Sequence, residues 1–407
     1  MTKIIAGTSF LFISIILFIP FKGIITHFPS FLNKNDSPEI ITKAQVDSAF
    51  NKVVDEFLLT IDSLYEKNQI PGMAISIVKD GEIIENRVWG YSDLNTKRRL
   101  DTLSVFRLAS VSKGFAPFIV GKLVDRGFIN WDDPVKKYIP QLELNSISAT
   151  ENLTIRHLLS HTTGLPRHTF SNLLDQEQDI NLIIQKLKDV PLRHSPGTYY
   201  DYQNVTYGLL ANVVESVTKR SYSQLLKEWI FEPAGMQNSS GSYDGMMNSS
   251  NIAFPHTRNR KGYIRSILSP RYYSVGPAAG VNASITDMGR WMQMLQTKST
   301  LMVSDSTLNE IFKPQISMCT CESNFSAWEG RLQKASYGFG WRILEFNQNK
   351  IYYHGGNVNQ YRSEIALDPE RKIGITILQN APGGFISKVI PTFWFKLQER
   401  VPKEKGV

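Results

Sequence analysis

Residues 106–115 have the sequence Phe-Arg-Leu-Ala-Ser-Val-Ser-Lys-Gly-Phe, and a mostly apolar run continues from there to Val124. The run predicts a buried helix, with Ser110 and Lys113 three residues apart at its start. At this spacing two side chains share one helix face, one turn apart. The lysine amine can accept or relay the serine proton, and the helix N-terminus favours negative charge on the attacking oxygen. The segment therefore predicts an activated serine nucleophile.

The same Ser-x-x-Lys spacing occurs twice more, from Ser76 to Lys79 and from Ser216 to Lys219. The first tetrad lies in a predicted strand, where residues three apart point to opposite faces of the sheet. The second is predicted to be an ordinary helix end, because no partner motif accompanies it. The spacing alone is therefore weak evidence, and the chemistry depends on what else the chain contains.

Composition excludes several classes of protein. The chain has 407 residues, 42% of them hydrophobic, so it can bury a large core. Its net charge of +8 is spread along the sequence without a basic stripe interleaved with aromatics, and nucleic-acid binding is not expected. His157 and His161 are four apart but lack the glutamate of a zinc-binding His-Glu-x-x-His helix, so no metal site is predicted. Cys319 and Cys321, one residue apart, are predicted to be two thiols rather than a disulfide.

The N-terminus has the pattern of a targeting segment. Lys3 precedes eighteen uncharged residues, 4–21, and a polar stretch follows. This pattern predicts a secretory signal or signal-anchor over residues 1–24 and a linker over 25–44. No clear Ala-x-Ala cleavage site follows, which favours an uncleaved anchor, the alternative being a signal cut at an atypical site. We therefore expect membrane attachment through this segment and a body in the cell envelope, periplasmic or on the outer face.

Seven Asn-x-Ser/Thr sequons occur, one of them at Asn204. Because Asn204 is also a candidate site residue, a glycan there would block the cleft. This favours a bacterial envelope, where such matches are chance.

The order of predicted elements indicates one sheet built from both ends of the chain. Apolar residues at helical spacing predict a helix over 41–67, and strands are expected over 72–78 and 82–90. The middle is mainly helical and loop-rich. Later strands and a closing helix are expected over residues 337–346, 351–354, 363–367, 373–379 and 385–398. The prediction is an α/β fold of the α+β type, an antiparallel sheet flanked by helices, spanning 45–400. Its sheet part comes from about 45–105 and 330–400, with an inserted helical lobe over about 106–329.

Two further motifs accompany the tetrad, each occurring once. Tyr202-Gln203-Asn204 lies in a loop before a predicted helix, so its phenol and amide can face a cleft. His354-Gly355-Gly356 ends a predicted strand, where glycines permit close backbone approach. Three motifs in this order are much stronger evidence than any one alone.

With these motifs the chain resembles the penicillin-binding-protein and class C β-lactamase-like serine hydrolases, over roughly residues 45–400. Segments 153–166 and 280–288 also resemble signatures of this family. The resemblance implies a β-lactamase/transpeptidase-like fold in which the three motifs converge on one cleft, without a metal or organic cofactor.

The resemblance also implies a role for each matching residue. Ser110 would form an acyl-enzyme and Lys113 would share or relay its proton. Tyr202, with a lowered pKa, would act as general base and then as general acid, although which of Lys113 and Tyr202 is the base stays open. Asn204 would hydrogen-bond a substrate amide. The remaining roles are substrate binding by His354 and Gly356 and an oxyanion hole from the backbone N–H groups of Ser110 and Asn357.

One departure limits the substrate prediction. His354 stands where β-lactamases of this group carry the lysine of Lys-Thr-Gly, and a histidine is only partly charged near neutral pH. This argues against an efficient β-lactamase and fits relatives that resemble esterases, D-amino-acid-directed peptidases and amidases. Arg362 is a candidate replacement for the missing cation, but a solvated arginine on a strand is the preferred interpretation.

The predicted function is an extracytoplasmic serine hydrolase that acts on amide or ester bonds of D-Ala peptides, esters or β-lactam-like substrates. The alternative is a catalytically weak penicillin-binding sensor or scaffold that binds cell-wall peptides. The intact Ser, Lys, Tyr and Asn favour the enzyme, because a binder needs no pair of proton-transfer groups. A small-molecule or peptide substrate and a monomeric chain are expected.

Overall fold

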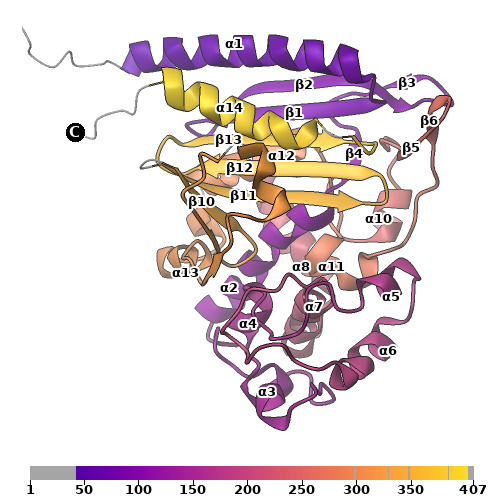
Figure 1. Cartoon of the computed structure of the whole chain (residues 1–407), viewed down its shortest axis with the longest axis vertical. Coiled ribbons are helices and arrows are strands. Elements are labelled where there is room, and N and C mark those ends of the chain that lie inside the picture. Colours follow the sequence, from indigo (N-terminus) through magenta and orange to yellow (C-terminus); the bar gives the residue numbers. More distant parts are fainter. Residues whose placement is uncertain (1–42, 298, 329, 347–348, 384, 402–407) are drawn as a thin grey trace, which may run out of the picture. The chain divides into compact units, whose positions relative to one another are not determined.

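An antiparallel β-sheet is the largest element of the computed structural model, which describes residues 43–401 except 298, 329, 347–348 and 384. Within this part of the chain the sheet has nine strands, in the order β3-β2-β1-β13-β12-β11-β10-β9-β8 (Figure 1). Their bounds are Gly72–Lys79 (β1), Glu82–Asp93 (β2), Arg98–Arg99 (β3), Ile316–Met318 (β8), Lys334–Tyr337 (β9), Arg342–Phe346 (β10), Asn349–Val358 (β11), Tyr361–Asp368 (β12) and Ile373–Gln379 (β13).

The two ends of the chain meet in the middle of this sheet. β1 pairs with β13 in a continuous register, from Met73 opposite Gln379 to Lys79 opposite Ile373. The mainly helical region between them is an insertion, as the predicted fold class requires. Two short antiparallel pairs lie within it: Val105–Arg107 (β4) with Asn282–Ser284 (β7), which are distant in sequence, and the hairpin of His256–Asn259 (β5) with Gly262–Arg265 (β6).

The predicted signal or anchor and nearly all of the predicted linker lie outside the described residues. Among the residues that are described, no helix combines the length and the apolar character that crossing a bilayer requires.

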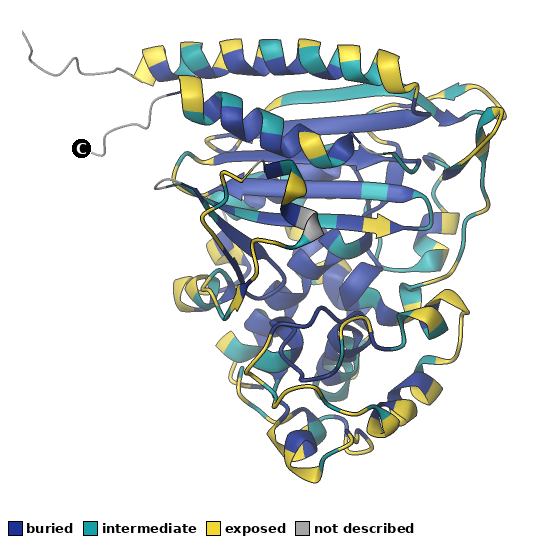
Figure 2. Ribbon diagram, in the orientation of Figure 1, coloured by how far each residue is buried: buried dark blue, intermediate teal, exposed yellow. Residues whose placement is uncertain are grey.

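Two helices cover one face of the sheet, α1 (Lys43–Asn68) and α14 (Ile386–Arg400) (Figure 1). Apolar residues of α1 recur at three- and four-residue spacing and face inward, so the helix is buried on one side and exposed on the other (Figure 2). The rings of Phe57 and Phe393 lie 4.9 Å apart where the two helices meet. This contact connects the first described helix to the last.

The other face is covered by α12 (Ile285–Thr297) and the helical lobe. Trp291 of α12 is fully buried and stacks on Phe115 at 4.4 Å, just before α2 (Ala116–Asp125). The remaining α-helices are Ile147–Asn152 (α3), Ile155–Leu159 (α4), Ser171–Asp175 (α5), Ile180–Gln185 (α6), Val205–Thr218 (α7), Tyr222–Leu226 (α8), Glu232–Ala234 (α9), Tyr243–Met247 (α10), Gly276–Ala279 (α11) and Asp305–Ile311 (α13).

Four local predictions are corrected by the structure. The run 337–346 is two strands, β9 and β10, because the chain reverses around Gly340, whose φ is +74°. Ser110 and Lys113 lie in a separate 3₁₀ turn, Ala109–Gly114 (η1), before α2 begins; residues three apart eclipse in a 3₁₀ helix, so the two side chains still face each other. The isolated His256 is predicted from the sequence to be a surface or loop residue, but it is fully buried on β5 and accepts a hydrogen bond from the Leu94 N–H.

The fourth correction concerns the cysteines. Cys319 and Cys321 form a disulfide, because a tight turn brings their Cα atoms to 5.2 Å, within the range that a disulfide spans.

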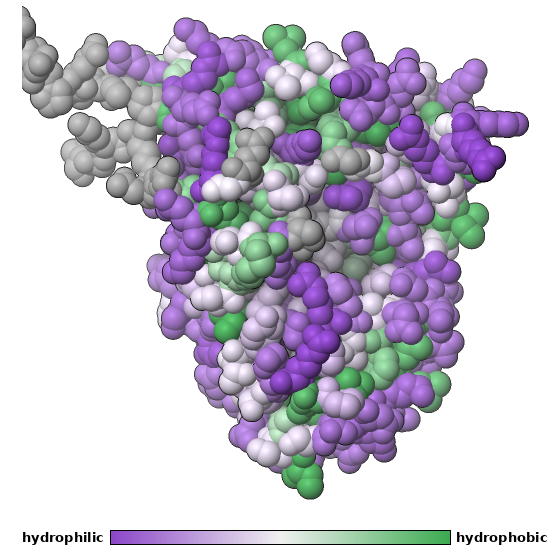
Figure 3. All heavy atoms as spheres, in the orientation of Figure 1, coloured by the Kyte–Doolittle hydropathy of each residue, from purple (hydrophilic) through white to green (hydrophobic). Residues whose placement is uncertain are grey.

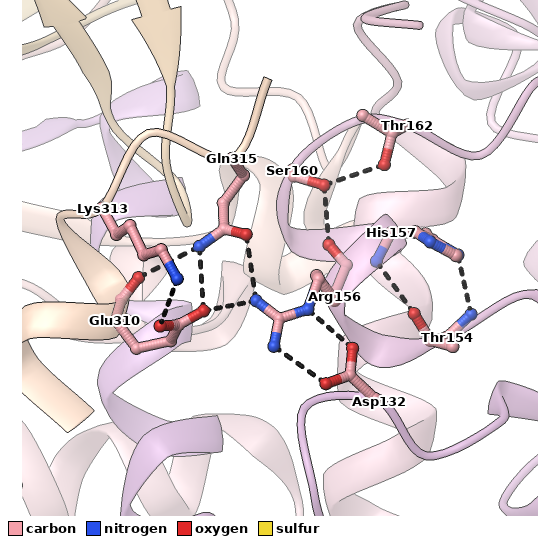
Figure 4. A network of polar contacts seen from close by, with 9 residues as sticks. All are labelled: Asp132, Thr154, Arg156, His157, Ser160, Thr162, Glu310, Lys313 and Gln315. Atoms are coloured by element: carbon pink, nitrogen blue, oxygen red, sulfur yellow. Dashed lines mark hydrogen bonds and ion pairs between the residues drawn. The ribbon is translucent and has the colours of Figure 1, made fainter. Parts of the chain in front are cut away.

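A polar network connects α4 to α13 and to the residue that precedes β8 (Figure 4). Arg156 of α4 pairs with Asp132 and with Glu310 of α13, and it donates to the Gln315 side chain at 2.9 Å. The Ser160 hydroxyl then donates to the Arg156 carbonyl at 2.8 Å, which shapes the turn after α4. That turn carries His161, a residue of the site.

Hydrophobic side chains on the face drawn in Figure 3 are scattered among hydrophilic ones. Exposed examples such as Leu59, Ile147 and Ile267 come from separate parts of the sequence. Single exposed apolar residues are normal for a globular protein, so none of them indicates a docking surface.

Phe57→Ala should lower the free energy of unfolding by about 3–5 kcal/mol, because it leaves a cavity where α1 meets α14. Leu59 lies on the same helix but is 66% exposed, so Leu59→Ala should change stability by about 0.5 kcal/mol or less. Urea titration of the two variants measures this difference. Equal losses would show that α1 is not docked as described.

Candidate active site

Ser110 lies on a strained turn that is pressed against strand β11. The preceding residue, Ala109, has a φ of +48°, a left-handed conformation that costs energy in a residue other than glycine. The Ser363 hydroxyl donates to the carbonyl of Leu108 at 2.5 Å and holds the turn against β12. A Cβ atom on Gly356 would lie 2.6 Å from the same carbonyl. Only glycine at this position lets the strand approach the serine so closely.

The Lys113 amine is fully buried and held by three oxygen atoms. Its Nζ lies 2.8 Å from Asn204 Oδ1, 3.0 Å from the carbonyl of Ala278 and 3.4 Å from Ser110 Oγ. Burial, together with the positive charge of Arg342, holds the pKa of Lys113 well below its usual range. A neutral amine has two N–H donors and one lone pair. In its neutral form Lys113 can donate to the first two oxygens and use the lone pair to accept from the Ser110 hydroxyl.

Two tyrosine rings enclose this amine. Nζ of Lys113 lies 4.6 Å from the centre of the Tyr202 ring and 5.4 Å from that of Tyr207. Aromatic faces attract cations, so the rings stabilise the ammonium that forms when Lys113 takes up a proton. The Tyr207 hydroxyl also donates to the Lys113 carbonyl at 2.8 Å, which fixes the end of the 3₁₀ turn.

The loop before α7 brings Tyr202 and Asn204 to the same place. His161 supports this loop: its ring lies 4.3 Å from the Tyr202 ring, and its Nδ1 accepts from the Gln203 N–H at 3.2 Å. The Asp201 N–H donates to the His161 carbonyl at 2.9 Å. His161 is thus a supporting residue of the loop. His157, the other half of the pair, caps α4 by accepting from the Thr154 N–H.

The pKa of Tyr202 departs from the expectation. Burial raises it above that of a free phenol, although Arg342, a hydrogen bond with Ser110 and Arg167 act in the opposite direction. The phenol is therefore neutral at physiological pH, where a lowered pKa was expected. A neutral phenol can donate a proton and pass it on, but it is a poor base.

The predicted residues meet at one cleft of about 630 Å³. Ser110, Tyr202, Asn204, Gly356 and Asn357 line it, and Lys113 lies just behind them. Another hollow of about 590 Å³, at the C-terminal end of α1, contains no residue of the three motifs. Both expected oxyanion-hole residues, Ser110 and Asn357, thus face the same space.

His354 does not lie where the sequence placed it. Its side chain is fully buried and does not line the cleft, because it points to the face of β11 that packs on the lobe. Its Nδ1–H donates to the Gly355 carbonyl at 2.9 Å, and its Nε2 accepts from the Tyr337 hydroxyl at 3.1 Å. Burial, Arg342 and Lys113 hold the pKa of His354 well below its usual range. It is a neutral supporting group, and the predicted substrate contact by His354 is not supported.

The cations of the cleft come from other strands. Arg342 on β10 is only 6% exposed, and its guanidinium lies 5.8 Å from the Tyr202 ring centre. Its Nε has no hydrogen-bond partner among the described residues. Arg362 on β12 also lines the cleft and is therefore not the solvated arginine that was preferred. Sequence reasoning missed Arg342, although a positive charge directly after the apolar and aromatic residues 337–341 was a signal for it.

Strand β11 has an open edge beside the serine. β10 pairs with β11 only along residues 349–353, so the part from His354 to Val358 is paired, among the described strands, only with β12. The Ser110 turn packs against the face of this part, at Gly356.

The fold, in which residues of the three motifs meet at one cleft, is that of a penicillin-binding protein homologue. The chain belongs to the beta-lactamase family, whose model matches residues 54–393. These findings confirm the predicted family and fold class.

Two relatives are similar to this chain in sequence, and one solved structure is similar to it in fold. Penicillin-binding protein 4* of Bacillus subtilis (strain 168) is 28% identical over 339 residues, which cover 78% of this chain and 70% of that protein. Protein flp of Staphylococcus aureus (strain MW2) is 26% identical over 340 residues, or 81% of this chain, which spans only 64% of the length of that protein. The octameric penicillin-binding protein homologue from Pyrococcus abyssi has the same fold, with a TM-score of 0.73 at 24% identity over 85% of this chain and 77% of its own.

Lys113→Arg should slow acylation of Ser110 by about 10²–10⁴-fold, because an arginine stays protonated and cannot accept the serine proton. Lys79→Arg is the matched control. Lys79 ends the Ser-x-x-Lys tetrad at residues 76–79, which is outside the site, and it pairs with Asp47 and Asp80, contacts that an arginine retains. Stopped-flow acylation with a chromogenic ester measures both variants.

The pH dependence tests the same assignment. The wild-type acylation rate should fall as pH drops through the lowered pKa of Lys113, since only the neutral amine accepts the proton. Arg342→Gln removes a positive charge that lowers this pKa, so the acid limb should move to higher pH. If the acid limb of the pH–rate profile does not move, a group other than Lys113 is responsible for it.

Proposed function

We propose that this chain is a serine hydrolase in which Ser110 forms an acyl-enzyme with peptide or ester substrates that carry a carboxylate beside the scissile bond. The observation that carries the proposal is the environment of Lys113. A neutral amine whose lone pair faces the Ser110 hydroxyl is a general base in the resting enzyme. A protein that only bound its ligand would not need a buried lysine held in this state.

The proposed first step moves one proton and forms one bond. Lys113 takes the proton of Ser110 Oγ while Oγ attacks the substrate carbonyl, and backbone N–H groups of Ser110 and Asn357 hold the oxyanion. Tyr202, a neutral phenol beside Ser110, relays the proton to the leaving amine or alcohol as the tetrahedral intermediate collapses. Water then attacks the ester of Ser110 by the same route in reverse. Asn204, already an acceptor for Lys113, positions the amine and hydrogen-bonds the substrate amide.

The substrate class follows from the strand edge and the cations. The open edge of β11 suits an extended peptide backbone, which pairs with it as an added strand. Arg342 suits a carboxylate, because a buried guanidinium with free donors gains most from an anion. D-Ala peptides and their ester analogues combine both features. We also propose, from the N-terminal pattern, that the reaction takes place outside the cytoplasm.

Labelling with a fluorescent fluorophosphonate and a fluorescent penicillin tests the nucleophile. Both reagents should label the wild type and fail with Ser110→Ala. Ser216→Ala, which removes the serine of the Ser-x-x-Lys tetrad at residues 216–219, should keep the label. Absence of label from folded wild-type protein would refute the acyl-enzyme. Stable label without turnover of esters or peptides would favour the sensor instead.

The test compares an ester that carries a carboxylate with the same ester in which a neutral carboxamide replaces the carboxylate. Arg342→Gln should lower kcat/KM for the carboxylated ester by about 10–100-fold relative to the neutral ester, because a charged hydrogen bond is lost. Arg331→Gln is the control, since Arg331 pairs with Glu399 outside the cleft. An equal loss for both substrates would assign Arg342 to the chemistry of Lys113 alone.

A further inference from the structure

The strand register places several charged groups of the cleft on one face of the sheet. Arg342 lies opposite Tyr353, Glu364 opposite Gly355, and Arg362 opposite Asn357. Residues directly opposite each other in an antiparallel pair share a face, and every second residue of β11 points the same way. These side chains therefore form one wall of the cleft, on the side where β11 borders β12.

Glu364 is open to the cleft because its partner in register has no side chain. A Cβ atom on Gly355 would lie 3.0 Å from the Tyr353 hydroxyl and 3.8 Å from Cγ of Glu364. The Glu364 carboxyl lines the cleft although the residue is only 2% exposed. Its Oε2 has no hydrogen-bond partner among the described residues. A buried carboxyl oxygen without a partner is costly unless a ligand completes it.

The surroundings of Glu364 determine its charge. Burial raises its pKa to about 8, although the charge of Arg362, a hydrogen bond with Tyr353 and the charge of Arg342 all act to lower it. Nη2 of Arg362 lies 4.0 Å from Glu364 Oε1, which is the limit of an ion pair. Among the described residues, the other elements at this wall contribute groups that do not titrate: Ser387 from α14 and Ser326 and Ala327 from the 3₁₀ turn Ser323–Trp328. Glu364 is thus mostly neutral below about pH 8 and anionic above it.

We propose that Glu364 is a specificity-determining residue whose neutral carboxyl reaches the cleft through the gap at Gly355 and donates a hydrogen bond to a substrate carboxylate held by Arg342. The inference rests on the proposed function, because it names a further partner for the same substrate group. Two guanidinium groups and one acid proton give the carboxylate donors on several sides. An ionised Glu364 would instead repel it and turn toward Arg362.

The wild-type enzyme tests this without any substitution. The measurement is the ratio of two kcat/KM values as a function of pH: that for the carboxylated ester, divided by that for the neutral ester in which a carboxamide replaces the carboxylate. The ratio cancels the titration of Lys113 and Tyr202, which both substrates share. It should fall about tenfold from about pH 7 to about pH 9, as Glu364 loses its proton. A ratio that stays constant would overturn the proposal.

Glu364→Gln assigns the effect to this residue. Glutamine keeps a neutral donor of the same shape but cannot ionise, so the ratio should remain near its neutral-pH value up to about pH 9. Glu345→Gln, which removes a carboxyl paired with Lys334 outside the cleft, should keep the alkaline decline. A decline that persists in Glu364→Gln would overturn the proposal. A preference for amine-bearing esters that increases above pH 8 would also do so, because it would show Glu364 binding a cation.

Turnover of the neutral ester separates the two proposals. If the wild type neither hydrolyses this ester nor acquires a label at Ser110, the proposed function fails. If the ester is hydrolysed and the wild-type ratio does not depend on pH, only the role of Glu364 fails.

Discussion

The burial of one amine is the constraint on which the rest of the site depends. Lys113 can stay neutral only if water is excluded and its two N–H groups are satisfied by protein oxygens. Those oxygens come from Asn204 and Ala278, at the ends of two different lobe segments. The tyrosines around the amine, the loop that holds Tyr202 and the ring of His161 beneath it all exclude water from the same point. Proton transfer at Lys113 therefore depends on the packing of the helical lobe.

The sequence was sufficient for some elements with a clear local pattern. The strand at Ile373–Gln379 was predicted with its observed bounds, because its apolar residues and the flanking turn residues define it. The three motifs were placed around one cleft through a family resemblance. Ser110 and Tyr202 are 92 positions apart, and nothing in the sequence around either residue reveals that the fold brings them together.

What could not be predicted depended on register. His354 and Gly355 are neighbours in sequence, yet they lie on opposite faces of β11, with the His354 side chain toward the lobe and Gly355 toward the cleft wall. The sequence lacks the lysine of Lys-Thr-Gly at His354, and the cations that line the cleft come from β10 and β12, from residues whose relevance appears only when the strands are paired. A strand shift of one residue would exchange the two faces, so no pattern within a single strand carries this information.

The pairing of β1 with β13 has a consequence for how the protein is made. More than 290 residues separate the paired positions, such as Met73 and Gln379, so the central pair cannot close until synthesis has passed the last strand. Contacts so distant in sequence are slow to form, and the early strands wait with unpaired edges meanwhile. The nucleophile turn is seated against β11 and β12, which are also made late. A ribosome-bound chain that stopped short of them would hold the serine and its lysine without the strands that close the cleft around them.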